Sequence, residues 1–149
     1  MGGPMDIESI LKSKGREVRT IAPAATVGET LHRLRHERIG ALVVSEDETS
    51  IAGIVSERGI MDALADRGIE VLGGSIGGVM TEKVFTCSRQ DRVGAVMVLM
   101  TNRRIRHVPV VEGDGQLCGI VSIGDVVKQQ LDAIQREAEA MREYISGSW

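Results

Sequence analysis

Aromatic residues are scarce in this sequence. Phe85, Tyr144 and Trp149 make up the 2% of aromatic residues in a chain of 149, which is too few to stack a series of single-stranded bases. The net charge is −3, whereas a general nucleic-acid binder neutralises phosphates with a basic surface. The sequence therefore predicts that nucleic acid is not a partner.

Long apolar runs are also missing. The sequence contains no stretch of about 18 apolar residues that could cross a membrane. The N-terminus does not show the basic, apolar and small-residue order of a secretion signal. We therefore expect a cytoplasmic protein without a membrane partner.

Cysteine and histidine are rare. The two cysteines, Cys87 and Cys118, are too few for a disulfide framework or a four-cysteine zinc site, so we expect buried free thiols. His32 and His36 are four residues apart on a predicted helix, but no third ligand is evident near them. We expect a solvated helix face there and no metal site.

The sequence contains an internal duplication. "GIVS" at 53–56 returns as "GIVS" at 119–122, and the same shift of 66 positions matches other residues without a gap. Because loop lengths are kept as well as elements, the repeated unit must set the architecture. The matched residues are Val18, Thr20, Val27, Gly28, Arg38, Ile39, Val44 and Glu46 with Val84, Thr86, Val93, Gly94, Arg104, Ile105, Val110 and Glu112.

Each unit predicts the order helix, strand, strand, helix. Thr26 and Glu29 form a capping pattern at the start of the first helix, and Gly68 is placed to end the second. Pro109 places its strand at a sheet edge or at a strand start. The predicted ranges are 26–39, 40–47, 51–57 and 58–68 in the first unit, and 91–102, 106–113, 117–122 and 124 onward in the second.

Two units of about 60 residues have small cores, so we expect them to pack face to face about a pseudo-twofold axis, with a cleft between them. The fold class is α/β, of the α+β kind. The predicted organisation is an N-terminal tail and helix (1–15), two repeats (16–72 and 73–132) and a C-terminal helix extension (133–149). Four methionines are expected to fill the cores, namely Met61, Met80, Met97 and Met100.

Several motifs together resemble a known family. They are the "GIVS" strands, the second followed by "xxD", the strands "IGALVV" and "IRHVPVV", and the segments "GREVRTIAP" and "MTEKVFTCS" that precede each unit's first helix. Over about 120 residues the chain resembles a tandem CBS-domain pair, or Bateman module, of the stand-alone bacterial type. The resemblance implies two β-α-β-β-α repeats related by a pseudo-twofold axis, disc-like homodimers, and adenine nucleotides (AMP, ADP or ATP) bound in two clefts.

The resemblance also implies the nucleotide-binding residues. Asp125 and Ser122 would hold ribose hydroxyls, with Gly124 at the start of the following helix. Adenine would be enclosed by Val79, Val84, Ile105 and Arg106 in one cleft and by Lys14, Val18, Ile39 and Gly40 in the other. Phosphates would be reached by Arg106 and His107, and by Arg38. Thr20, Ala41, Ser56 and Arg58 complete the expected set.

Simple chemistry supports the nucleotide-binding roles that the resemblance implies. A carboxylate such as Asp125 can accept hydrogen bonds from both ribose hydroxyls, and a helix start offers free N–H groups to an anion. The segment 102–107 is the densest cationic stretch of the chain. For Arg103 and Arg104 the alternative is a solvated helix end, where arginine complements the helix dipole.

Gly59 stands in the first repeat where the second has Asp125. The first repeat therefore lacks the ribose-binding carboxylate, although Ser56, Glu57 and Arg58 remain at the turn. We expect the two clefts to differ, one holding AMP or ATP and the other a dinucleotide such as NAD(H), or nothing. Alternatively, Gly59 only relaxes the turn and Glu57 or water replaces the lost contact.

The C-terminal segment predicts a long helix from Asp125 to about Tyr144. Its apolar residues follow alternating spacings of four and three, which is typical of a coiled-coil seam: Val127, Leu131, Ile134, Ala138, Met141 and Ile145. This seam favours a homodimer. The alternative is a helix folded back on its own lobe.

No catalytic constellation is evident. Ser56 and Ser122 lack the "GxSxG" setting of a hydrolase nucleophile. The sequence therefore predicts a non-catalytic adenine-nucleotide sensor that acts on an unidentified regulated protein. The alternative is a structural dimerisation or adaptor protein whose nucleotide clefts are vestigial.

Overall fold

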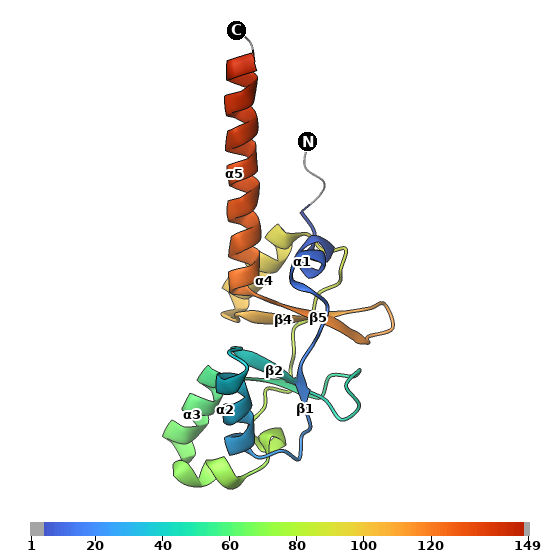
Figure 1. Ribbon diagram of the computed structural model, residues 1–149. Helices are drawn as coiled ribbons and strands as arrows, with labels where there is room; N and C mark the ends of the chain where they lie inside the picture. Colours follow the sequence, from blue (N-terminus) through green and yellow to red (C-terminus); the bar gives the residue numbers. More distant parts are fainter. Residues whose placement is uncertain (1–4, 148–149) are drawn as a thin grey trace.

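The computed structural model describes residues 5–147. Two lobes lie one above the other, and their small sheets face each other between the helices (Figure 1). This is the mixed α/β arrangement expected from the duplication.

The first lobe contains a three-stranded sheet in the order β1-β2-β3. β1 runs parallel to β2, and β2 runs antiparallel to β3. The Thr26 hydroxyl accepts a hydrogen bond from the Glu29 amide (3.0 Å), and Gly68 ends the second helix with a φ of 83°, as the sequence predicts. The elements are β1 (Thr20–Ile21), α2 (Val27–His36), β2 (Ala41–Val44), β3 (Gly53–Ser56) and α3 (Glu57–Arg67).

The second lobe repeats this order with one strand fewer. Its leading strand is reduced to an isolated parallel bridge between Cys87 and Val110. Pro109 lies in a sheet of only two strands, as its missing N–H predicts. The elements are α4 (Val93–Arg103), β4 (His107–Val111), β5 (Leu117–Ser122) and α5 (Ile123–Gly147).

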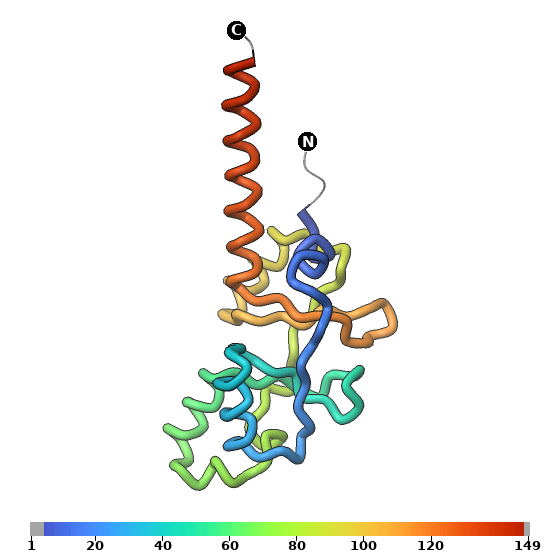
Figure 2. The backbone as a smooth tube through the Cα atoms, viewed as in Figure 1, coloured from blue at the N-terminus to red at the C-terminus, as the bar shows by residue number. Residues whose placement is uncertain are grey.

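The leading segments of the two repeats are exchanged between the lobes. α1 (Ile7–Lys14) precedes the first repeat but packs Ile7, Ile10 and Leu11 into the core of the second lobe. The matching segment 73–80, which includes the short helix η2 (Ile76–Gly78), opens the second repeat but packs into the core of the first lobe beside the short helix η1 (Ile69–Gly73). Figure 2 shows the chain crossing between the lobes after α1 and again before α4.

The first glycine of each "GIVS" strand makes room for an exchanged segment. A Cβ on Gly53 would lie 2.6 Å from the Met80 sulfur and 2.9 Å from the Thr81 carbonyl oxygen. A Cβ on Gly119 would lie 2.7 Å from a methyl carbon of the buried Leu11. Since real Cβ contacts are essentially never this short, a side chain at either position would force the neighbouring segment to shift.

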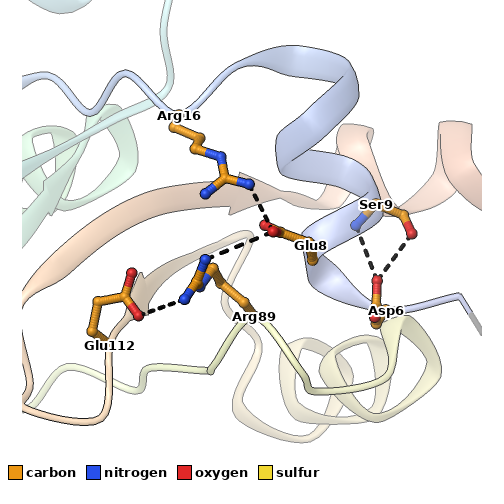
Figure 3. A network of polar contacts seen from close by, with 6 residues as sticks. All are labelled: Asp6, Glu8, Ser9, Arg16, Arg89 and Glu112. Atoms are coloured by element: carbon orange, nitrogen blue, oxygen red, sulfur yellow. Dashed lines mark hydrogen bonds and ion pairs between the residues drawn. The ribbon is translucent and has the colours of Figure 1, made fainter.

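Ion pairs fix α1 on the second lobe (Figure 3). Glu8 accepts a hydrogen bond from Arg16 at 2.7 Å and lies 3.7 Å from Arg89. Arg89 in turn donates to Glu112 at 2.9 Å. The side chain of Asp6 caps the N-terminus of the helix. Lys14 is the last residue of this helix.

The expectations for buried residues are confirmed in part. Cys87 is buried and Cys118 is half-buried, and both are free thiols. Burial raises the pKa of Cys87 to about 12. Met100 is in the core, but the expectation for Met61 is wrong, because its side chain is 66% exposed on α3 at the rim of a cleft.

α5 extends far from the second lobe (Figure 1). It runs to Gly147, and every residue from 134 to 147 is exposed. The alternative of a helix folded back on its own lobe is therefore wrong. Within 5–147, none of the helices is both long enough and apolar enough to cross a membrane.

Candidate functional site

Two clefts open between the facing sheets. The larger has a volume of about 840 Å³ and the smaller about 380 Å³, both within the range of small-ligand sites. Gly40, Ala41 and His107 line both clefts, so the middle strands β2 and β4 form the wall that separates them.

The larger cleft combines the start of α3 with the segment that leads into the second repeat. Its apolar lining includes Val79, Val84 and Phe85, and the turn from Ser56 to Gly59 also lines it. The predicted site residues that line it are Gly40, Ala41, Ser56, Arg58, Val79, Val84, Ile105, Arg106 and His107.

Positive charge is concentrated in the larger cleft. Its lining carries a single carboxylate, Glu57, against five cationic side chains, namely Arg58, Lys83, Arg103, Arg104 and Arg106. Within residues 5–147, none of these five cations forms an ion pair. Because the whole chain has a net charge of −3, this local excess favours an anionic ligand with more than one charge.

Two of these cations lie over the ring of Phe85. The guanidinium of Arg103 lies 4.8 Å from the ring centroid and the ammonium of Lys83 lies 5.8 Å from it. Cation–π attraction therefore fixes both charges at the apolar wall. Arg103 and Arg104 do end α4, but both also line the cleft.

The turn at Gly59 keeps its backbone geometry without a carboxylate. The Ser56 hydroxyl accepts a hydrogen bond from the Gly59 amide at 3.1 Å, which caps α3. A Cβ on Gly59 would meet only this hydroxyl, at 3.5 Å. Space therefore permits a side chain at Gly59.

The smaller cleft lies at the start of α5. Seven predicted site residues line it, namely Lys14, Arg38, Ile39, Gly40, Ala41, His107 and Ser122. Glu17, Arg19 and Ile120 complete the lining. Ser122 thus shares this cleft with Lys14 and Ile39, whereas Ser56 shares the larger one with Val79 and Ile105.

Asp125 is engaged at the edge of the smaller cleft. Its Oδ2 accepts hydrogen bonds from Lys14 Nζ at 2.6 Å and from the Ser122 amide at 2.9 Å, while the Ser122 hydroxyl accepts from the Asp125 amide at 3.1 Å. Lys14 also donates to the Ile120 carbonyl at 3.0 Å. Burial opposes ionisation of Asp125, but the hydrogen bonds from Lys14 and Ser122 outweigh it and lower the pKa.

Four predicted site residues line neither cleft: Val18, Thr20, Gly124 and Asp125. Thr20 pairs with Val43 in the sheet, and its carbonyl accepts a hydrogen bond from Arg33. Asp125 lies next to the smaller cleft behind Lys14, and its Oδ1 has no hydrogen-bond partner in the described part of the chain.

Sequence reasoning missed several lining residues. Lys83 and Phe85 line the larger cleft, and Glu17 and Arg19 occupy the same repeat positions in the smaller one. The shift of 66 positions relates the two pairs, so the repeat alignment contained the signal. The alignment also shows that the two clefts differ in charge at matched positions, because Lys83 corresponds to Glu17 and Phe85 to Arg19.

His107 lies where the two clefts meet. A Cβ on Gly40 would lie 2.9 Å from its ring, so the two middle strands approach closely here. Burial lowers the pKa of His107, and the charges of Lys14 and Arg106 lower it further against the opposing effect of Asp125. The imidazole is therefore neutral near pH 7 and can donate and accept hydrogen bonds.

The family model of the CBS domain matches the chain twice, over residues 10–66 and 76–132. The chain belongs to the CBS-domain family. The two matches are offset by 66 positions, which is the shift of the internal duplication, and the two clefts lie between the CBS lobes.

Known CBS proteins resemble this chain over most of its length. The mitochondrial CBS domain-containing protein CBSX3 of Arabidopsis thaliana is 32% identical over 96% of this chain and 73% of its own. A CBS-domain containing protein from Agrobacterium tumefaciens has a structure with a TM-score of 0.82 and 38% identity, covering 87% of this chain and 97% of that one. A CBS domain protein from Pyrobaculum aerophilum, solved in complex with AMP, has a TM-score of 0.72 and 29% identity, covering 80% and 88%.

Proposed function

We propose that this CBS pair is a non-catalytic regulatory module that binds an adenine nucleotide, with the larger cleft as the main site. The observation that carries the proposal is the group of five cationic side chains around an apolar wall in a cavity of about 840 Å³. The wall suits a purine base, and the cations suit phosphates. The AMP complex of the Pyrobaculum aerophilum protein supports an adenine nucleotide as the ligand class.

The charge of the larger cleft favours ligands with several phosphates. One phosphate cannot contact all five cations, so we expect ATP and ADP to bind more tightly than AMP. NADH carries two phosphates and tests whether a second nucleoside is tolerated. The missing carboxylate at Gly59 means that phosphate contacts, rather than ribose contacts, supply most of the affinity in this cleft.

The smaller cleft is proposed as a weaker site for a nucleoside monophosphate such as AMP. Its candidate ribose ligand, Asp125, already accepts a hydrogen bond from Lys14. A ribose would use the open Oδ1 or displace the Lys14 ammonium. Arg38 is the cation placed to meet the phosphate.

Calorimetric titration of the full chain with AMP, ADP, ATP and NADH tests the proposal. We expect ATP to bind at least about tenfold more tightly than AMP, because each charge-assisted hydrogen bond contributes about 1.5–3 kcal/mol. Arg106→Gln should weaken ATP binding by about tenfold to a hundredfold. Arg136→Gln is the matched control, because Arg136 is exposed on the distal part of α5, and it should leave ATP affinity unchanged.

Two outcomes would contradict this function. Binding of none of the four nucleotides would leave the alternative, a structural dimerisation or adaptor protein, for which the exposed face of α5 is the supporting observation. Equal weakening by Arg106→Gln and Arg136→Gln would show that ATP binds by general charge attraction and not in the larger cleft. In either form of the proposal the working unit is a homodimer. In the nucleotide-binding form, a regulated protein responds to its ligand state.

A further inference from the structure

An exposed apolar stripe runs along α5 from its second turn to near its end. The stripe consists of Val127, Leu131, Ile134, Ala138, Met141 and Ile145. The five larger side chains are between 43% and 60% exposed. From residue 134 onward the helix has every side exposed and projects away from both lobes (Figure 1).

The spacing of the stripe is that of a coiled-coil seam. Leu131, Ala138 and Ile145 take heptad position a, and the other three residues take position d, so the apolar side chains recur every 3.5 residues on average. The exposed part of α5, residues 134–147, is about as long as the isolated helices that are only marginally stable in water unless an apolar side is packed. The stripe therefore needs a partner that matches a heptad repeat, and a second copy of α5 provides one.

The charged residues beside the seam distinguish the two possible orientations. Glu137 is at position g, and Lys128 and Arg142 are at position e. In a parallel pair, Glu137 of one copy faces Arg142 of the other on both sides of the seam. In an antiparallel pair with matched apolar layers, Glu137 faces Glu137 and Lys128 faces Arg142. Opposite charges meet in the first arrangement and like charges in the second.

We propose that two copies of this chain pair through α5 as a parallel coiled coil about a twofold axis. A closed twofold dimer is the commonest symmetric assembly, and the exposed charges beside the seam select the parallel form. The two second lobes then lie together at the base of the coil, and the first lobes lie farthest from its tip. This inference does not depend on nucleotide binding, so it can fail or succeed independently of the proposed function.

Sedimentation equilibrium of the full chain tests the pairing. We expect a dimer, and Ile134→Gln should raise its dissociation constant about a hundredfold, because a seam side chain is lost in both helices. Ile134 is exposed and far from the lobes, so their thermal unfolding should not change. Arg136→Gln, on the outer side of the coil, is the matched control and should leave the dimer unchanged. A chain that stays monomeric, or a dimer that does not respond to Ile134→Gln, would overturn the proposal and leave the stripe to a different protein.

Arg142→Glu tests the orientation, because the two arrangements predict opposite signs. In the parallel coil the introduced carboxylate faces Glu137 of the other copy, so dimerisation should weaken about tenfold. In the antiparallel coil the same carboxylate would face Lys128 and tighten the dimer. The double variant Glu137→Arg with Arg142→Glu should restore the parallel dimer. Tightening by the single variant, or a trimer or tetramer in either experiment, would overturn the parallel twofold arrangement.

Discussion

Gly59 and Asp125 occupy matched positions but give their helices different starts. Asp125 and Ser122 exchange hydrogen bonds in a reciprocal cap, whereas Gly59 retains only the bond from its amide to Ser56. Both repeats therefore have the same backbone turn, but only the second has a carboxylate there. A carboxylate in the first turn of a helix also interacts favourably with the helix dipole.

Exchanging the two residues should change stability in opposite directions. Gly59→Asp should raise the free energy of unfolding by about 1 kcal/mol, because it completes the cap of α3 and removes a flexible glycine. Asp125→Gly should lower it by at least about 1 kcal/mol, because the cap of α5 and the ion pair with Lys14 are both lost. Urea unfolding at pH 7 measures both. A loss of stability in Gly59→Asp would show that glycine is needed at this turn for another reason.

The burial of His107 makes stability depend on pH. Its pKa in the folded protein lies below the ordinary value of 6.5, so the unfolded chain takes up the proton first as the pH falls. The stabilisation from a neutral His107 is fully present above about pH 6.5 and is lost as the pH falls through and below that value. We expect the midpoint temperature of thermal unfolding to decrease as the pH is lowered from about 7.5 to about 5.5. The decrease should be smaller in His107→Gln. Identical pH profiles would show that His107 is not the group responsible.

At the scale of elements, the exchanged leading segments join the two lobes. α1 contributes to one core and η2 to the other, and each passes over the first glycine of a "GIVS" strand. The lobes should therefore unfold together, because neither has a complete core without the segment that comes from the other repeat.

Glycine substitutions test this packing. Gly53→Ala should lower the free energy of unfolding by about 1–3 kcal/mol, since the added methyl would overlap Met80 and the backbone oxygen of Thr81. Gly94→Ala is the matched control, because Gly94 is exposed in α4 with open space around it. That control should be neutral or stabilising by up to about 1 kcal/mol. Equal effects of the two substitutions would contradict the close approach.

Most elements could be predicted from the sequence because local signals determine them. Thr26 and Gly68 mark helix ends through their own backbone chemistry, and the β-branched runs mark strands within a few residues. The exchange of α1 could not be predicted, because periodicity shows that Ile7, Ile10 and Leu11 form an apolar face but not which core receives it. The loss of the leading strand in the second lobe likewise depends on pairing across space.

The candidate site was predicted less completely than the fold. Motif positions identified Arg106, His107 and Ser122, which do line the clefts. They did not show that Lys14 pairs with Asp125, because the two are far apart in sequence and meet only through the docking of α1. Nor did they show that the cations at the end of α4 and Lys83 converge on one cleft.

At the scale of the whole molecule, the two clefts and the long helix meet at the second lobe. Asp125 lies in the first turn of α5 and beside the smaller cleft, and the seam of the proposed coil begins two residues later, at Val127. The larger cleft is separated from the smaller by Gly40 and His107. A ligand in the larger cleft can alter the assembly only to the extent that it favours one arrangement of these elements over another.

Hydrogen exchange with and without ATP, read by mass spectrometry, tests the central claim most directly, because it locates the ligand on the chain. We predict slower exchange in peptides covering 54–61, 79–85 and 103–107, which form the larger cleft, with no change in 134–147. Exchange that is unaltered at saturating ATP, or slowed only outside these three segments, would contradict the proposal that the larger cleft binds an adenine nucleotide.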